Sequence, residues 1–153
     1  MKNLLLIGLL FILVLCDQLS KFWITKNFLL GESRTLIPGF FSLTFVRNDG
    51  AGFSILKGYR SFFLWITVFA VIVFAIMWIR SSKQNKWERI AYLLILAGTI
   101  GNFIDRLIAG SVVDFLDFVI FGYNFPVFNI ADALLTIGAI LFILSIGKEK
   151  KNG

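Results

Sequence analysis

The pattern of apolar positions along this chain consists of four long apolar stretches separated by polar segments. The clearest stretch, residues 61–79, contains no charge and is flanked by Arg60 and Arg80. The other three contain a few polar or charged residues and cover residues 4–24, 90–108 and 127–147. About 20 mostly apolar residues are needed to cross the hydrocarbon core of a bilayer as a helix. The pattern therefore predicts an α-helical integral membrane protein with four transmembrane helices.

The two longer connections between these stretches have different patterns. Residues 43–53 alternate between apolar and polar and contain Asn48-Asp49-Gly50, a turn signal. We expect a short strand or hairpin there, at the outer membrane surface, with Phe45 and residues 39–41 as candidates for contact with the lipid interface. For residues 109–126 we expect a loop that folds over the outer end of the helix bundle.

The distribution of charge predicts how the chain is oriented in the membrane. The chain is 58% hydrophobic with a net charge of +6, and the basic residues cluster in residues 80–89 and 148–153, whereas residues 109–126 have no Lys or Arg. Basic loops remain cytoplasmic, so we expect both termini and the 80–89 loop inside, and residues 25–60 outside. We attribute the positive charge to this orientation and expect no nucleic-acid partner. The length fits one membrane-embedded domain, residues 1–153.

The missing residue types exclude several kinds of chemistry. The chain has no histidine and one cysteine, Cys16, so it can form neither an ordinary zinc site nor an internal disulfide, and we expect no metal and no cofactor. A Ser–His pair is excluded as well. Ser20 and Lys21 do not form a Ser–Lys catalytic pair, because neighbouring residues on a helix point apart. Residues 1–16 resemble a lipoprotein leader, but Leu15 is too large for the position before the cysteine, so we interpret 4–24 as a retained helix. Carboxylates and water are what remains for hydrolysis.

Polar residues within apolar stretches are candidates for function. Asp17 and Lys21 are four residues apart and share a helix face. We interpret them mainly as an ion pair that holds the first helix in place. Asn102, Asp105 and Arg106 also lie on neighbouring positions of one helix, where spacing alone favours neither a polar helix end nor a clamp for substrate carbonyl groups.

Two further aspartates suggest acid–base chemistry. Asn129 and Asp132 are three apart on one face of a helix that we expect to begin near Pro126. One interpretation is a protonated Asp132 bonded to another helix. In the other, the loop carries Asp114 toward Asp132, and two carboxylates that share a site have split pKa values, so that one is a base and the other an acid. We expect Asp117 to be solvated.

Five motifs, taken together, resemble a known family. The segments DQLSK (17–21), RNDGA (47–51), GNFIDR (101–106), VVDF (112–115) and FNIAD (128–132) are similar in order and spacing to those of the lipoprotein signal peptidases, or signal peptidase II. The resemblance covers nearly the whole chain. It implies a bacterial inner-membrane aspartyl protease with four transmembrane helices and a small extracytoplasmic β-structure, which cleaves prolipoproteins before a diacylglyceryl-modified cysteine.

The resemblance also implies roles for particular residues. Asp114 and Asp132 would be catalytic, and the polar residues lining the site would be Asn48, Asn102, Arg106 and Asn129. Supporting residues would be Asp17, Lys21 and Asp105. The chain departs from the family pattern at Gly52, where an alanine is common, which affects the stiffness of a loop near the substrate.

Two other functions compete with this interpretation. Buried aspartates also occur in small proton-coupled transporters, whose sites lie near the membrane midplane, whereas here we expect the polar residues in the outer half of the bundle. A purely structural membrane subunit would leave those polar residues without a purpose. The hypothesis is therefore a monomeric enzyme whose partners are lipid-modified prolipoproteins and membrane lipid, with its active site near the outer face.

Overall fold

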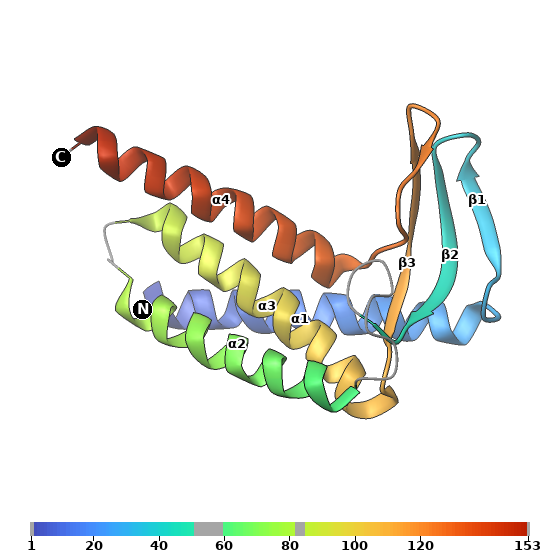
Figure 1. The fold of residues 1–153 in the computed structure, drawn as a ribbon, viewed down its shortest axis with the longest axis horizontal. Helices are drawn as coiled ribbons and strands as arrows, with labels where there is room; N and C mark the ends of the chain where they lie inside the picture. The colour runs from blue at the N-terminus through green and yellow to red at the C-terminus, as the bar shows by residue number, and fades with distance from the viewer. Residues whose placement is uncertain (1, 51–59, 82–84, 153) are drawn as a thin grey trace.

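The computed structural model describes residues 2–50, 60–81 and 85–152. These residues form four helices and one four-stranded sheet (Figure 1). The elements in chain order are α1 (Lys2–Asn27), β1 (Ser33–Ile37), β2 (Phe41–Asn48), α2 (Arg60–Arg80), α3 (Lys86–Ala109), β3 (Val112–Ile120), β4 (Tyr123–Asn124) and α4 (Ile130–Asn152). The helices run along one another, and the sheet stands across one end of the bundle. The start of α1 and the end of α4 lie at the opposite end.

The four predicted apolar stretches correspond to the four helices. Two helices, Leu4–Asn27 and Lys86–Ala109, are long and apolar enough to cross a membrane, and shorter apolar stretches lie in α2 and α4. The start of α4 is at Ile130, later than the predicted residue 127. The reason is that Phe128 pairs with the sheet, since its N–H donates to the carbonyl of Leu116 and its carbonyl accepts from the N–H of Leu116.

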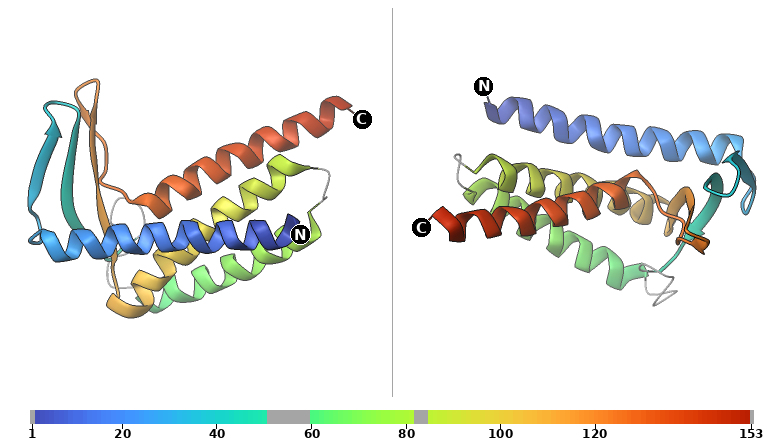
Figure 2. Two further views of the ribbon diagram at one scale, coloured as in Figure 1. Left: turned by 180° about the vertical axis from the view of Figure 1, so that it is seen from behind. Right: turned by 90° about the horizontal axis from the view of Figure 1, so that it is seen from above.

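Helix α3 lies at the centre of the bundle, between α4 and α2 (Figure 2). Its packing against α4 is close, because a Cβ at Gly98 would overlap the backbone carbonyl of Ala131. In contrast, the outer surfaces of the bundle expose large apolar side chains, among them Phe11 on α1, Trp65 and Phe69 on α2 and Ile143 on α4. Exposed apolar surface of this extent is typical of helices that contact lipid.

The sheet has the order β1-β2-β3-β4 with all neighbours antiparallel. The strand predicted around residues 43–53 is present as β2. The loop predicted for residues 109–126 is wrong, because Val112–Ile120 forms a nine-residue strand. Between the pairs Leu43↔Leu116 and Val46↔Asp114, the register of β2 and β3 shifts by one residue. Such a bulge bends a strand and re-aims its side chains, and this one lies next to Asp114.

The two faces of β3 have different neighbours. Val113 and Phe115 face a core cluster that includes Ile24 on α1 and Phe28, directly after this helix. Phe45 is buried in the same cluster at 6% exposure, so its predicted contact with lipid is wrong. Because side chains alternate along a strand, Asp114 projects from the opposite face.

Candidate active site

A cavity of about 710 Å³ lies between the sheet and the start of α4. Strand β3 contributes Val112, Asp114, Phe118 and Ile120, which are all on one face of the strand. Among the described residues, its polar wall consists of Asn48, Asn102, Arg106, Asp114, Asp132 and Thr136. Its apolar wall consists of Phe40, Val112, Phe118, Ile120, Phe125, Pro126, Val127, Phe128, Ala133 and Ile137. The cavity therefore brings two carboxylates to the wall of an otherwise mainly apolar space.

Asp132 is held in the first turn of α4 by a reciprocal cap. The side-chain oxygen of Asn129 accepts from the N–H of Asp132 at 2.9 Å, and Oδ2 of Asp132 accepts from the N–H of Asn129 at 3.2 Å. This is the geometry of a capping box, with Asn and Asp in place of the usual Ser or Thr and Glu. Its other oxygen, Oδ1, accepts from Nδ2 of Asn102 on α3 at 2.7 Å. The carboxylate is thus oriented through both oxygens.

Asp114 is held in a similar way from two other elements. Its Oδ1 accepts from Nδ2 of Asn129 at 2.6 Å, and its Oδ2 accepts from Nδ2 of Asn48 on β2 at 3.2 Å. The residue is 3% exposed. Burial and, second, the negative charge of Asp132 together raise the pKa of Asp114 to about 6, against the lowering effect of the two amide hydrogen bonds and of Lys21. The charge of Asp132 therefore disfavours the ionised form of Asp114.

Asn129 forms hydrogen bonds with both carboxylates. It is fully buried and is not among the residues that line the cavity, although the resemblance implied a position lining the site. One amide proton goes to Asp114 and the other to Oδ1 of Asn102, at 3.2 Å. Every polar atom of this side chain therefore has a partner.

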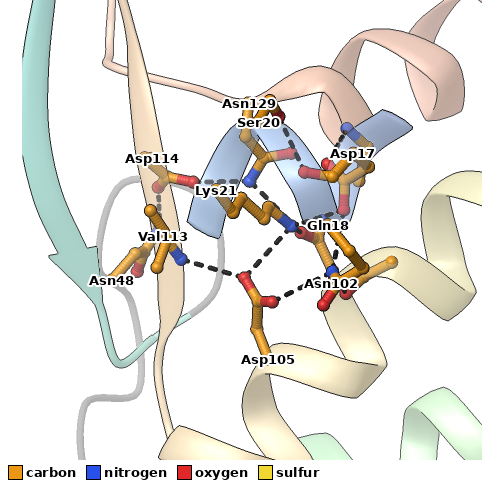
Figure 3. A network of polar contacts seen from close by, with 12 residues as sticks. Asp17, Gln18, Ser20, Lys21, Asn48, Asn102, Asp105, Val113, Asp114 and Asn129 are labelled. Atoms are coloured by element: carbon orange, nitrogen blue, oxygen red, sulfur yellow. Dashed lines mark hydrogen bonds and ion pairs between the residues drawn. The ribbon is translucent and has the colours of Figure 1, made fainter. Parts of the chain in front are cut away.

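Lys21 lies at the centre of a second, fully buried group (Figure 3). Its ammonium contacts Asp17 at 2.9 Å, Asp105 at 3.1 Å and Oδ1 of Asn102 at 3.0 Å. An ammonium has three protons to donate, and these three partners use them all. The ion pair predicted from the spacing of Asp17 and Lys21 is confirmed, and Asp105 joins it.

The charge of Lys21 also fixes the direction of the hydrogen bonds at the cavity. Since an ammonium can only donate, Asn102 must turn its oxygen toward Lys21 and its N–H toward Asp132. The same oxygen accepts from Asn129, whose other proton then points to Asp114. A cation on α1 thereby sets the orientation of the donors on both carboxylates.

Backbone contacts tie the same group to the segments that carry the two aspartates. Asp17 accepts from the N–H of Ala131, next to Asp132. Asp105 accepts from the N–H of Val113, next to Asp114. The two structural carboxylates thus position the chain on either side of the cavity.

Sequence reasoning missed two members of this group. The amide of Gln18 donates to Asp17, Asp105 and the carbonyl of Gly101 at 3.0–3.1 Å. A signal was present, because Gln18 lies three residues before Lys21 and so shares its helix face. Gly101 lets α1 approach, since a Cβ there would lie 2.5 Å from an oxygen of Asp17.

The remaining predicted residues are placed as follows. Arg106 lines the cavity, and its Nη2 donates to the carbonyl of Gly50 at 3.3 Å. Asp117 projects from the other face of β3 and accepts from Thr44 at 2.6 Å, so it is bonded to the sheet rather than simply solvated. Gly52 lies outside the described residues.

Comparisons with known proteins agree with the motifs. The family model described as "Signal peptidase (SPase) II" matches residues 9–148. The lipoprotein signal peptidases of Staphylococcus aureus strains JH9 and Newman are 44% identical over 139 residues, which is 91% of this chain and 85% of theirs. A bacterial membrane enzyme solved by the in meso method at 2.3 Å superposes with a TM-score of 0.91 at 42% identity, covering 96% of this chain and 90% of that one. A second such structure, at 1.9 Å, has a TM-score of 0.85 at 42% identity, covering 92% and 91%.

Proposed function

The chain belongs to the signal peptidase II family of aspartic peptidases and removes signal peptides from prolipoproteins in a bacterial membrane, and we propose that Asp114 and Asp132 catalyse this cleavage. The observation that carries the proposal is their arrangement. Both carboxylates line one cavity, and Asn129 is bonded to both. A transporter site would be expected near the membrane midplane, whereas these residues lie at the end of the bundle next to the sheet.

The mechanism that fits this arrangement is general acid–base attack by water. Two carboxylates in one site do not both ionise easily, so the pair keeps one proton over a range of pH. The ionised carboxylate takes a proton from water as the water oxygen attacks the scissile carbonyl carbon. The protonated carboxylate donates a hydrogen bond to the carbonyl oxygen and stabilises the negative charge that develops there. As the tetrahedral intermediate collapses and the C–N bond breaks, a carboxylic acid of the pair gives a proton to the leaving amine.

The other polar residues serve binding or positioning in this proposal. Arg106 and Asn48 lie on the cavity wall and can donate to substrate carbonyl groups beside the scissile bond. Asn102 lines the cavity too, and it orients Asp132. Positioning from behind falls to Asn129, Asp17, Lys21 and Asp105, which are all buried.

The apolar wall suits a lipid-modified substrate. Phe118, Phe125, Val127 and Ile137 present apolar side chains within the same cavity as the two aspartates. A diacylglyceryl-modified cysteine next to the scissile bond would bury its acyl chains against such a wall. Because those chains belong to the bilayer, the cleavage site has to lie near the membrane surface.

We further propose that all of residues 1–153 form one membrane-embedded domain with four transmembrane helices. The shortest helix, α2, has 21 residues, which corresponds to about 31 Å at 1.5 Å per residue and matches a hydrocarbon core of about 30 Å. Both termini would be cytoplasmic, with the sheet and cavity at the outer face. The enzyme would act as a monomer, without a cofactor or nucleic acid.

Incubation of the purified protein with a diacylated prolipoprotein tests the function directly. We expect release of the signal peptide, and no release from an otherwise identical precursor without the diacylglyceryl group. Cleavage of both precursors at the same rate would contradict the lipid-dependent part of the proposal. For the topology, a cysteine at residue 84 in a protein with Cys16→Ala should be labelled only from the cytoplasmic side, and one at residue 120 only from outside.

A further inference from the structure

We propose that the turn between β3 and β4 inserts Phe121 into the lipid interface beside the cavity. Phe121 is the most exposed large apolar residue of the described chain, at 106% of its reference area. It is not on the cavity wall. The proposal concerns a membrane contact and goes beyond the cleavage reaction.

The backbone of this turn disfavours a phenylalanine. Ile120 pairs with Tyr123, so the hairpin turns through only two residues, Phe121 and Gly122. Both have positive φ, 51° and 78°, as a type I′ turn requires. Asn-Gly is the preferred pair for such a turn, and a bulky residue at positive φ carries a steric cost. Because the ring is fully exposed, packing within the protein does not offset that cost.

The neighbours of Phe121 form an apolar rim along this edge of the sheet. The rim consists of exposed side chains from the end of β1, the turn that follows it and the β3–β4 hairpin: Leu36, Ile37, Phe40, Ile120, Phe121 and Tyr123. The two turns are joined, since the carbonyl of Phe40 accepts from the N–H of Val119 at 2.9 Å and the rings of Phe40 and Phe118 are 5.5 Å apart. Residues 118–127 contain no charge. The chemistry of the rim therefore fits an uncharged apolar partner.

The position of the rim identifies that partner as the bilayer. The sheet stands across the end of helices whose sides expose apolar residues, and the hairpin turn extends past the start of α4 (Figures 1 and 2). On α4, Ile137 lines the same cavity as Ile120 of the hairpin, and both Ile137 and Ile140 are exposed. A surface that begins on a membrane helix and ends in Phe and Tyr is typical of the interface region, where aromatic rings are enriched.

A fluorescent label at the turn tests the contact without any cleavage assay. The protein with Cys16→Ala and Phe121→Cys is labelled with an NBD dye and placed in phosphatidylcholine–phosphatidylglycerol vesicles. We expect blue-shifted emission that is quenched at least twofold by lipids with doxyl groups on the acyl chains and little by aqueous iodide. A label after Thr35→Cys, on the exposed strand β1, is the matched control and should be quenched by iodide.

Two outcomes would overturn the proposal. In the first, the label at the turn is quenched by iodide as strongly as the control. In the second, doxyl quenching appears only after a prolipoprotein is added, which would make the hairpin part of the substrate site. Because the readout needs no catalysis, it fails or succeeds independently of the proposed reaction.

The change Phe121→Asn separates anchoring from folding. It restores the preferred Asn-Gly turn, so we expect an unchanged or higher thermal midpoint in detergent. With the label at Tyr123→Cys instead, the same change should reduce doxyl quenching at least twofold. Unaltered quenching would show that Phe121 is not the anchor, and a lower thermal midpoint would contradict the argument from the turn.

Discussion

Two pairs of aspartates lie close together in this molecule and have different surroundings. Asp17 and Asp105 share the ammonium of Lys21 and are not among the residues that line the cavity. Asp114 and Asp132 line the cavity and are held by the amides of Asn48, Asn102 and Asn129. Within the described ranges, neither of these two forms an ion pair. The same side chain is thus paired with a cation in one region and with neutral donors in the other.

This difference separates carboxylates that suit a structural role, which are paired with a cation, from carboxylates that suit proton exchange, which are held by neutral amides. Asp17 and Asp105 contact the ammonium of Lys21 at 2.9 and 3.1 Å, and such buried ion pairs suit a structural role. Neutral amide donors orient a carboxylate and stabilise its charge less. Burial and the charge of Asp132 raise the pKa of Asp114 to about 6, which suits acid–base catalysis at near-neutral pH.

The most direct test of this difference is to remove a carboxylate at the cavity. Asp114→Asn and Asp132→Asn should each lower the cleavage rate by about 10²–10⁴-fold or more, because an amide cannot exchange the proton that the reaction needs. The measurement is the rate of signal-peptide release from a diacylated prolipoprotein. Circular dichroism in detergent should show that both variants are folded.

The matched control lies on the same strand. Asp117→Asn changes a carboxylate that faces away from the cavity and is bonded to Thr44, so we expect it to retain most activity. If Asp117→Asn is as inactive as Asp114→Asn, or if either dyad variant cleaves at nearly the normal rate, the assignment of the pair is wrong.

The cation-paired region should respond in stability instead. Removing one partner from a buried ion pair typically costs about 3–5 kcal/mol. Lys21→Ala leaves two buried carboxylates without their cation, whereas Asp17→Ala leaves Lys21 still paired with Asp105. We therefore expect Lys21→Ala to lower the free energy of unfolding more than Asp17→Ala, in thermal or denaturant unfolding in detergent.

A double change tests whether the loss of stability comes from carboxylates left without their cation. Asp17→Ala with Lys21→Ala should recover only part of the stability lost in Lys21→Ala, because Asp105 remains without its cation. Single variants that melt like the wild type and yet do not cleave would show that Lys21 acts directly in the reaction.

Much of this organisation was predictable because it depends on the spacing of nearby residues in the sequence. Apolar length predicted the helices, and the four-residue spacing of Asp17 and Lys21 predicted their ion pair. Asp105 was placed among the supporting residues by motif resemblance. These features depend on helix periodicity or on continuous apolar stretches, which a sequence displays directly.

The features that were missed depend on contacts between distant segments. Strand β3 was mistaken for a loop because both of its faces carry apolar residues, Val113 and Phe115 on one and Val112 and Phe118 on the other, which hides the alternation. The buried position of Asn129 follows from its cap on α4 and its bonds to Asp114 and Asn102, none of which spacing reveals. Close approach at Gly101 likewise exists only once α1 and α3 are packed together.

A glycine tests how closely the structural region is packed. Gly101→Ala would put a methyl group 2.5 Å from Asp17, so we expect a loss of about 1–3 kcal/mol from overpacking. Gly8→Ala in α1 is the control, because nothing lies within 4 Å of that position, and alanine should stabilise the helix by up to about 1 kcal/mol. Equal melting temperatures for the two variants would contradict the close packing seen at Asp17.

The smallest expected effect is a shift in pH dependence at the cavity. The hydrogen bond from Asn48 lowers the pKa of Asp114, which burial and Asp132 raise to about 6. Asn48→Ala removes a donor to the ionised form, so the pKa of Asp114 should rise. In a pH profile of kcat/KM, the limb nearest pH 6 should therefore move upward, by roughly several tenths to one pH unit. Thr44→Ala, which removes the bond to Asp117 on the other face of β3, should leave that limb in place. A downward shift in Asn48→Ala, or an equal shift in both variants, would mean that the amide donors at the cavity do not control the ionisation of the pair.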